Sequence, residues 1–227
     1  MQVLAINTLG VLYVVENGNA VQSMADLTGK TIVASGKGST PEYALRYLLT
    51  ENGIDPDTGV TIDWKSEHSE CVASLASGAA TIAMLPQPFV TVAQTQLPDL
   101  RVALDLTEEW DKLDNGSALL TGVVVARKDF VEEHPTAVAT FLEDYSASVS
   151  WVNENTADAA ELIAGYGAAV AEKALPYCNI VCITGAEMKE KLSGYLQVLF
   201  DADPASVGAD PADESTGLPG DDFYYGA

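Results

Sequence analysis

The segment SGKGST at residues 35–40 carries the densest group of atoms in this chain that could bind a small molecule. It follows a short apolar stretch and precedes a helix-forming stretch, and its two glycines allow the backbone to approach a ligand closely. The first N–H groups of a helix lack internal partners and carry the positive end of the helix dipole. Such a loop can hold a sulfonate, a carboxylate or a phosphate-like group. The candidate ligand-binding residues of the loop are Ser35, Lys37, Gly38, Ser39 and Thr40.

The same residues also fit the start of a helix that binds nothing. Ser39 followed by Glu42 matches a capping box, in which each side chain accepts a hydrogen bond from the backbone of the other residue. Pro41 suits the first helical turn. The local pattern leaves both interpretations open.

The spacing of the glycines argues against a nucleotide-binding loop. The Walker A motif G-x-x-x-x-G-K-[ST] needs a first glycine and a closing serine or threonine. Around Gly36-Lys37 these two positions hold Thr31 and Gly38, and no G-x-G-x-x-G motif follows. We therefore predict no nucleotide cofactor.

Two further polar residues are candidates because of their neighbours in the chain. Gln87 lies between Pro86 and Pro88, so a rigid corner could hold its amide over a cleft, although a hinge turn with no ligand is the alternative. Thr8 precedes a glycine that interrupts the first apolar run, where it could face a ligand.

A third cluster contains Trp64, Glu67 and His68. Trp64 could stack on a ring, but a tryptophan in an alternating strand is more often part of the core. His68 and Cys71 lie one helical turn apart, as a nucleophile and its base would. That chemistry also needs an orienting group and an oxyanion site, which the sequence does not supply. We expect packing there, and we predict no catalytic residue.

The cysteines do not form a metal or disulfide framework. The chain has three, Cys71, Cys178 and Cys182, without the C-x-x-C spacing of zinc sites or a neighbouring histidine pair. We expect buried free thiols, no metal and no cofactor.

Composition limits the partners. The chain has 227 residues, 48% of them hydrophobic, and a net charge of −22, so a folded protein is expected that repels nucleic acid and anionic membranes. No segment reaches the roughly 18 apolar residues of a membrane span. The first residues, MQVLAINTLG, lack the basic region and core of a signal peptide.

Periodicity predicts alternating strands and helices between residues 30 and 106, which favours an α/β unit with a mainly parallel sheet. Open sheets of this kind bind ligands beyond the carboxyl ends of their strands. Three such ends carry polar residues, at 35–40, 66–70 and 87. The expected strands are 3–15 (interrupted at Gly10), 31–34, 60–65, 81–85, 100–106 and 119–126, with an extended piece at 175–183. The expected helices are 41–51, 66–78, 90–96, 135–152, 157–166, 168–174 and 185–200, followed by an irregular tail at 201–227.

The order of several motifs resembles the type II periplasmic solute-binding proteins of ABC importers, in the branch for nitrate, sulfonate, taurine and thiamine-precursor compounds. The resemblance covers about residues 10–200. The matching pieces are SMADLTGK at 23–30, the glycine-serine loop at 35–40, SGAATIAMLPQPF at 77–89, and GVVVARKDFVEEHP at 122–135.

The resemblance implies two α/β lobes that clamp a ligand between them. Residues 20–115 correspond to the complete second lobe. Residues 1–19 and 116–227 correspond to the crossing strands and the C-terminal part of a first lobe, which is incomplete relative to family members.

The function that the resemblance implies is capture of a small, anionic or sulfonate-like solute without catalysis. The implied partners are an ABC permease and its ATPase, and the implied location is extracytoplasmic. An enzyme or a ligand-sensing domain on the same fold is the alternative. A turnover assay distinguishes a binding protein from an enzyme. Neighbouring genes for a permease and an ATPase distinguish an importer component from a ligand-sensing domain.

Overall fold

The computed structural model describes residues 1–163, 165, 167–210, 213 and 216–227. These residues divide into two compact units. We call Val11–Asp114 the inserted unit, and Met1–Gly10 together with Asn115–Ala227 the terminal unit. The inserted unit begins earlier than residue 20, the boundary expected from sequence, because a strand just after Gly10 belongs to its sheet.

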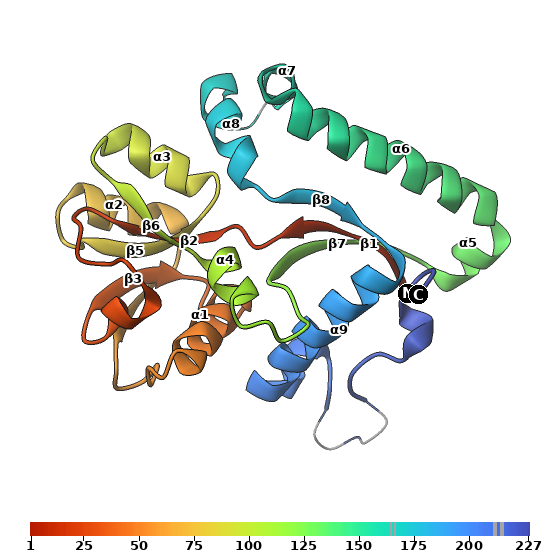
Figure 1. The fold of residues 1–227 in the computed structure, drawn as a ribbon, viewed down its shortest axis with the longest axis horizontal. Coiled ribbons are helices and arrows are strands. Elements are labelled where there is room, and N and C mark those ends of the chain that lie inside the picture. Colours follow the sequence, from red (N-terminus) through yellow and green to blue (C-terminus); the bar gives the residue numbers. More distant parts are fainter. Residues whose placement is uncertain (164, 166, 211–212, 214–215) are drawn as a thin grey trace. The chain divides into compact units, whose positions relative to one another are not determined.

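The inserted unit contains a five-stranded sheet in the order β4-β3-β5-β2-β6 (Figure 1). β3 pairs in parallel with β4 and β5, whereas β2 runs antiparallel to β5 and β6. The expected mainly parallel sheet is therefore confirmed, with β2 as the exception. Its strands are β2 (Leu12–Glu16), β3 (Thr31–Ser35), β4 (Thr61–Lys65), β5 (Ile82–Pro86) and β6 (Arg101–Asp105).

Helices cover both faces of this sheet. Alternate residues of a strand share a face, so Val33 of β3 and Leu85 of β5 pack with Val72 and Leu75 of α2 in one buried cluster. Each such side chain contributes about 1.5–3 kcal/mol by leaving water. The helices are η1 (Met24–Leu27), α1 (Thr40–Glu51), α2 (His68–Ala76), α3 (Phe89–Gln96) and α4 (Leu106–Asp111).

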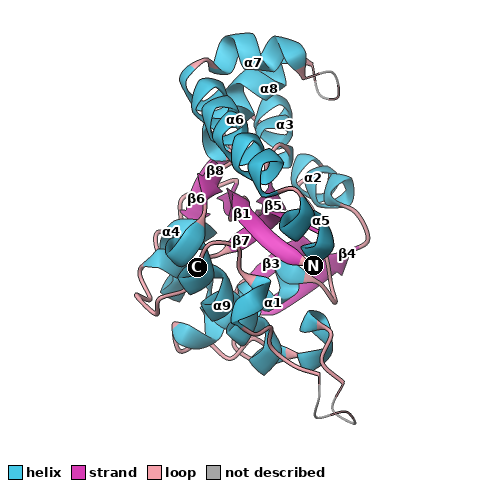
Figure 2. Cartoon of the chain, turned by 90° about the vertical axis from the view of Figure 1, so that its right-hand side faces the viewer, coloured by secondary structure: helices cyan, strands magenta, loops and turns pink. Residues whose placement is uncertain are grey.

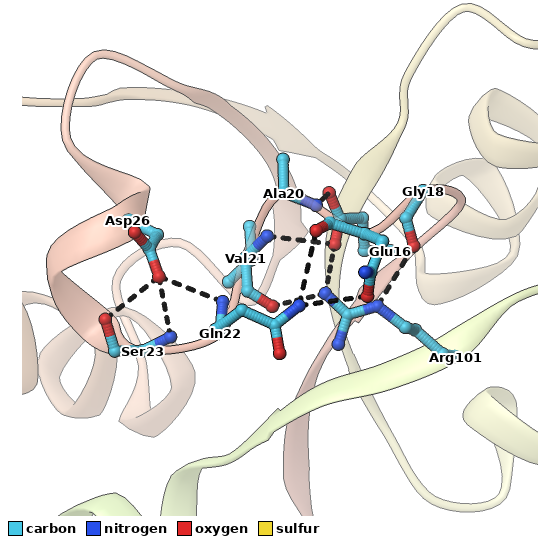
Figure 3. Close-up of polar contacts among 9 residues, drawn as sticks. Glu16, Gly18, Ala20, Val21, Gln22, Ser23, Asp26 and Arg101 are labelled. Carbon is cyan, nitrogen blue, oxygen red and sulfur yellow. Dashed lines mark hydrogen bonds and ion pairs between the residues drawn. The ribbon is translucent and has the colours of Figure 1, made fainter.

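A buried ion pair closes the turn that follows β2 (Figure 3). The Glu16 carboxylate accepts hydrogen bonds from the N–H groups of Ala20 (2.9 Å) and Val21 (3.1 Å) and pairs with the Arg101 guanidinium. Arg101 also donates to the carbonyl of Gly18 at 3.0 Å. Burial raises the pKa of Glu16, but these hydrogen bonds outweigh it, so the pKa lies below its usual value of 4.5.

The terminal unit contains a three-stranded antiparallel sheet in the order β7-β1-β8, formed by β1 (Gln2–Leu9), β7 (Leu120–Ala126) and β8 (Ile180–Ile183). Figures 1 and 2 show α6 and α9 on opposite sides of these strands. Leu4 of β1 packs with Val131 and Val138 in one cluster. The helices are α5 (Lys128–Glu133), α6 (Pro135–Glu154), α7 (Thr156–Leu162), α8 (Ala168–Ala174), η2 (Leu175–Tyr177), α9 (Gly185–Ala202), η3 (Pro204–Val207) and η4 (Asp221–Phe223).

The C-terminal tail is more regular than expected. Two short helical turns, η3 and η4, interrupt it, and its end returns to β1 through a bridge between Val3 and Tyr224. The helix expected at 157–166 ends at Leu162, and its predicted residues 164 and 166 lie outside the described residues. Among the described helices, none combines the length and the apolar character that crossing a membrane requires.

Candidate functional site

A short polar contact at the carboxyl edge of the inserted sheet joins Ser35 to His68. Ser35 ends β3 on the face that α2 covers, and His68 is the first residue of α2. The Ser35 Oγ and His68 Nδ1 atoms lie 2.5 Å apart. Ser35 is only 3% exposed. Its hydroxyl therefore holds the imidazole in place and is not itself accessible to solvent.

His68 is half-buried against Phe89, with ring centroids 5.0 Å apart. Burial lowers the pKa of His68 below 6.5, and the nearby Glu67 carboxylate opposes that shift. The start of a helix also disfavours a positive charge. The lowered pKa favours the neutral ring, and its Nε2 atom has no hydrogen-bond partner among the residues described.

Cys71, one turn further along α2, is a buried thiol. Its Sγ lies 3.8 Å from the carbonyl oxygen of Glu67, and burial raises its pKa. A thiol that resists ionisation is a poor nucleophile, so the packing role expected for Cys71 is confirmed. The expectation of burial is wrong for Cys178 and Cys182, which are only partly buried. Cys182 lies on the edge strand β8, and Cys178 lies at the end of η2, just before that strand.

Gln87 follows β5 at the same edge of the sheet, and α3 fixes its side chain. Its Oε1 atom accepts hydrogen bonds from the Thr91 hydroxyl (3.0 Å) and the Thr91 backbone N–H (3.4 Å). Its own N–H donates to the carbonyl of Val11 at 3.0 Å. The side chain is half-buried, and its Nε2 group has no partner within the described ranges.

The glycine-serine loop folds back on itself. Gly36 and Gly38 have positive φ angles of 87° and 77°, and a Cβ on Gly36 would lie 2.8 Å from the Pro41 ring. The Ser39 hydroxyl donates to the Gly36 carbonyl at 2.7 Å. Glu42 Oε2 accepts the Gly38 N–H at 2.6 Å.

These bonds correct two expectations. The capping box between Ser39 and Glu42 does not form, because Ser39 donates to Gly36 and Glu42 accepts from Gly38 instead. The amide hydrogens of Gly38 and Ser39 were expected to be available to a ligand, but both have partners. The Gly38 N–H donates to Glu42, and the Ser39 N–H donates to the Gly36 carbonyl at 3.2 Å. An anion at this loop therefore meets a carboxylate already in place.

Lys37 and Thr40 complete the loop. Lys37 is exposed, and its ammonium group forms no ion pair with any residue that the structure describes. Thr40 is half-buried and begins α1. The exposed Lys37 side chain can therefore reorient toward a ligand.

The other two sequence candidates are Trp64, on the strand beside Ser35, and Thr8, in the terminal unit. Trp64 is half-buried in the edge strand β4, where it pairs with Ala34. Thr8 belongs to β1 of the terminal unit, and its hydroxyl donates to Asn7 Oδ1 at 3.1 Å. The structure therefore groups Ser35, His68 and Gln87 at one sheet edge and leaves Thr8 in the other unit.

Sequence reasoning missed Thr91 and Phe89. Thr91 is the only buried polar residue of α3 among the residues described, and it lies four positions after Gln87, the spacing at which a helical residue meets its neighbour. That spacing was a usable signal. The Phe89 contact with His68 joins two different helices, so no pattern of neighbouring residues in the sequence could have predicted it.

The polar side chains at this edge offer hydrogen-bond donors and acceptors. In the described part of the chain, no three histidine, cysteine, aspartate or glutamate side chains gather as a metal site would require. A separate surface pocket of about 340 Å³ lies in the terminal unit at α5. Arg127 lines it but is paired with Asp129, so its charge is already compensated.

Comparison with known proteins gives the family and the fold. A family profile described as "ABC transporter, phosphonate, periplasmic substrate-binding protein" matches residues 4–175. A search of curated proteins found no match. An ABC transporter structure from Parabacteroides distasonis aligns with a TM-score of 0.75 at 21% identity, over 98% of this chain and 73% of that one.

Two sulfonate-binding proteins named SsuA are also similar. The aliphatic sulphonate binding protein from Escherichia coli aligns with a TM-score of 0.69 at 17% identity, over 89% of this chain and 67% of that one. The alkanesulfonate-binding protein from Xanthomonas axonopodis pv. citri, bound to MOPS, aligns with a TM-score of 0.60 at 19% identity, over 88% of this chain and 67% of that one.

These alignments confirm the expected α/β fold of two-lobed periplasmic binding proteins. The family profile covers most of the chain. Members of this family are periplasmic and bind small molecules for a transporter. The chain belongs to the phosphonate-type periplasmic substrate-binding protein family of ABC transporters, and it is a substrate-binding component of an ABC importer.

Proposed function

We propose that this chain captures a small anion with a phosphonate or sulfonate head group at the carboxyl edge of the inserted sheet, and hands it on unchanged. The family description names phosphonate, and two structural relatives bind sulfonates by name. The observation that carries the proposal is the presence of His68 and Gln87 at that edge, each with an Nε2 atom that has no partner among the described residues.

Neutral donors suit such a ligand. The oxygens of a phosphonate or sulfonate accept several hydrogen bonds, and each bond to a charged group contributes about 1.5–3 kcal/mol. Gln87 offers an amide N–H, and His68 offers a ring N–H when the Ser35 hydroxyl donates to its Nδ1 atom. Lys37 adds a mobile positive charge. The net charge of −22 repels anions generally, so local donors must overcome that field.

The proposed action is capture by closure. The ligand favours the conformation of the protein that binds it better, and so shifts the population toward that conformation. The proposed recipients are the permease and ATPase of the importer. On the ligand-binding surface we include Lys37, Gly38, Ser39, Thr40, Trp64, His68 and Gln87 of the inserted unit, and the buried Ser35 takes part by holding His68.

The Ser35–His68 contact also raises an enzymatic alternative, because a hydroxyl beside an imidazole can act as a nucleophile. Two observations oppose it. The Ser35 side chain is buried, so it cannot reach a substrate. No carboxylate hydrogen-bonds the His68 ring among the described residues, so the orienting group of such a site is missing.

Calorimetric titration of the chain with methylphosphonate and with ethanesulfonate tests the proposal. We expect saturable binding of at least one probe, weakened about tenfold or more by Gln87→Ala and by Lys37→Ala. Gln197→Ala is the matched control, because Gln197 is an exposed glutamine of α9 in the terminal unit. Wild-type chain that binds neither probe contradicts the ligand class. Binding that neither variant weakens contradicts the site.

Catalysis is tested separately. Methylphosphonate incubated with the chain should show an unchanged ³¹P NMR spectrum over hours, because no residue in the proposed site activates a nucleophile. Appearance of free phosphate in proportion to protein concentration would overturn the assignment as a binding protein.

A further inference from the structure

Four polar residues are buried among those that the structure describes: Glu16, Ser35, Thr91 and Thr107. A buried hydroxyl costs free energy unless it is hydrogen-bonded. Glu16 is accounted for by Arg101, and Ser35 by His68. Thr91, only 5% exposed, directs its hydroxyl to Gln87.

The geometry around Thr91 fixes which end of the Gln87 amide faces the helix. Both the hydroxyl (3.0 Å) and the backbone N–H (3.4 Å) of Thr91 approach the same Gln87 atom. A backbone N–H can only donate, so the atom that it meets must be the amide oxygen. The amide nitrogen then points away from α3, and the described residues provide it with no partner.

The Thr91 hydroxyl is itself free to donate. Among the described residues, it hydrogen-bonds Gln87 and no other group. The Thr95 hydroxyl bonds the backbone carbonyl of Thr91 at 2.9 Å and not its side chain. Valine at position 91 would keep the shape of the side chain but remove the stronger of the two bonds to the amide oxygen. The Gln87 amide could then rotate and present oxygen or nitrogen in turn.

We infer that Thr91 is a positioning residue, which orients the Gln87 amide so that its N–H donates to an oxygen of the bound solute. This inference rests on the proposed function. It makes position 87 selective for a group that accepts hydrogen bonds, such as a phosphonate or sulfonate oxygen. A ligand that places an ammonium group there is rejected, because two donors would face each other.

The test compares Thr91→Val with Thr91→Ser, which restores the hydroxyl. In titrations with methylphosphonate and ethanesulfonate, Thr91→Val should weaken binding about five- to tenfold, and Thr91→Ser should stay within about twofold of wild type. Thr95→Val is the matched control on the same helix and should not change affinity. Thermal unfolding of each variant reports any general loss of structure.

A double-mutant cycle separates positioning from a structural effect. In a Gln87→Ala background, Thr91→Val should have no further effect on affinity, because the group that it orients is gone. Equal weakening in both backgrounds overturns the inference, and so does wild-type affinity in Thr91→Val alone. Gln87→Glu, which keeps the acceptor and loses the donor, should abolish measurable binding.

A ligand-free measurement keeps the inference testable if neither probe binds. The side-chain ¹⁵N amide signal of Gln87, assigned by its loss in Gln87→Ala, should show a rigid heteronuclear NOE in wild type. Thr91→Val should make that amide mobile, and Thr91→Ser should restore it. An equally rigid amide in Thr91→Val overturns the positioning role. Absence of binding with a rigid wild-type amide contradicts only the proposed ligand class.

Discussion

The Ser35 Oγ atom lies 2.5 Å from the Nδ1 atom of His68, across 33 positions of sequence. The contact exists because β3 and α2 share a face of the sheet, where Val33, two residues before Ser35, packs with Cys71 and Leu75 of α2. A buried hydroxyl thus fixes a half-buried imidazole at the end of a strand. Thr91 holds Gln87 in the same manner one strand away.

Ser35→Ala should weaken binding of methylphosphonate by about 1–2 kcal/mol, because the His68 ring loses the bond that sets its orientation. The variant removes a single oxygen atom, so its free energy of unfolding in urea should fall by little more than this. Ser66→Ala, at an exposed position beside the same helix, is the control. Titration calorimetry with both variants decides the point, and equal affinities would show that His68 is oriented without Ser35.

Stability should depend on His68 as the pH falls. Burial holds its folded-state pKa below 6.5, so the unfolded chain binds the proton more readily. The contribution of His68 to the free energy of unfolding should therefore be fully present above about pH 6.5. It should be lost as the pH falls from there toward the folded-state pKa. Urea unfolding between pH 7.5 and 5 should show this decrease in wild type and in His134→Gln. His68→Gln should show less of it, and identical slopes in all three proteins would contradict the prediction.

The ion pair of Glu16 and Arg101 should be one of the larger single contributions to the stability of the inserted unit. Arg101→Met leaves the buried Glu16 carboxylate without its cation, which we expect to cost about 2–4 kcal/mol. Arg127→Met is the control. It breaks an exposed pair with Asp129 and should cost less than about 1 kcal/mol. Urea unfolding at pH 7 measures both, and a similar small loss in the two variants would show that the backbone N–H groups suffice for Glu16.

The same ion pair predicts an acid dependence. The folded-state pKa of Glu16 lies below 4.5, so its contribution is present above that value and is lost as the pH falls through the folded-state pKa. Glu16→Gln should have a shallower loss of stability below pH 4.5 than wild type. Parallel curves for the two proteins would assign the acid sensitivity to other carboxylates.

Much of the inserted unit could be predicted because glycines and prolines mark the ends of its strands and helices. Gly29, the glycines of the loop and the two prolines around Gln87 place the ends of β3, α1 and β5 to within a few residues. The first apolar run was harder. It reads as one buried strand, but it supplies β1 to one sheet and β2 to another, and apolar composition is the same for both sheets.

The site was less predictable because its contacts are not local. Spacing placed His68 and Cys71 on one helix, but only the parallel register of β3 with its neighbours brings Ser35 to that helix. The start of α1 was predicted correctly, but the capping box was not, for a different reason. The capping box and the observed bonds of Ser39 and Glu42 satisfy the same number of donors, so the sequence could not choose between two arrangements of similar energy.

Glu42 should compete with an anionic ligand for the loop. Its carboxylate accepts the Gly38 N–H at 2.6 Å, so it occupies the place that a sulfonate or phosphonate oxygen would take. Glu42→Gln keeps the length of the side chain and removes the charge, and it should tighten methylphosphonate binding by a few fold, or about 0.5–1 kcal/mol. Glu51→Gln, at the other end of α1, is the matched control and should leave the affinity unchanged.

The gain in affinity of Glu42→Gln should shrink in high salt, because screening weakens the repulsion between the Glu42 carboxylate and the ligand. Equal affinities for wild type and Glu42→Gln would mean that the anion does not approach Gly38. His68 and Gln87 would then hold the ligand without the loop.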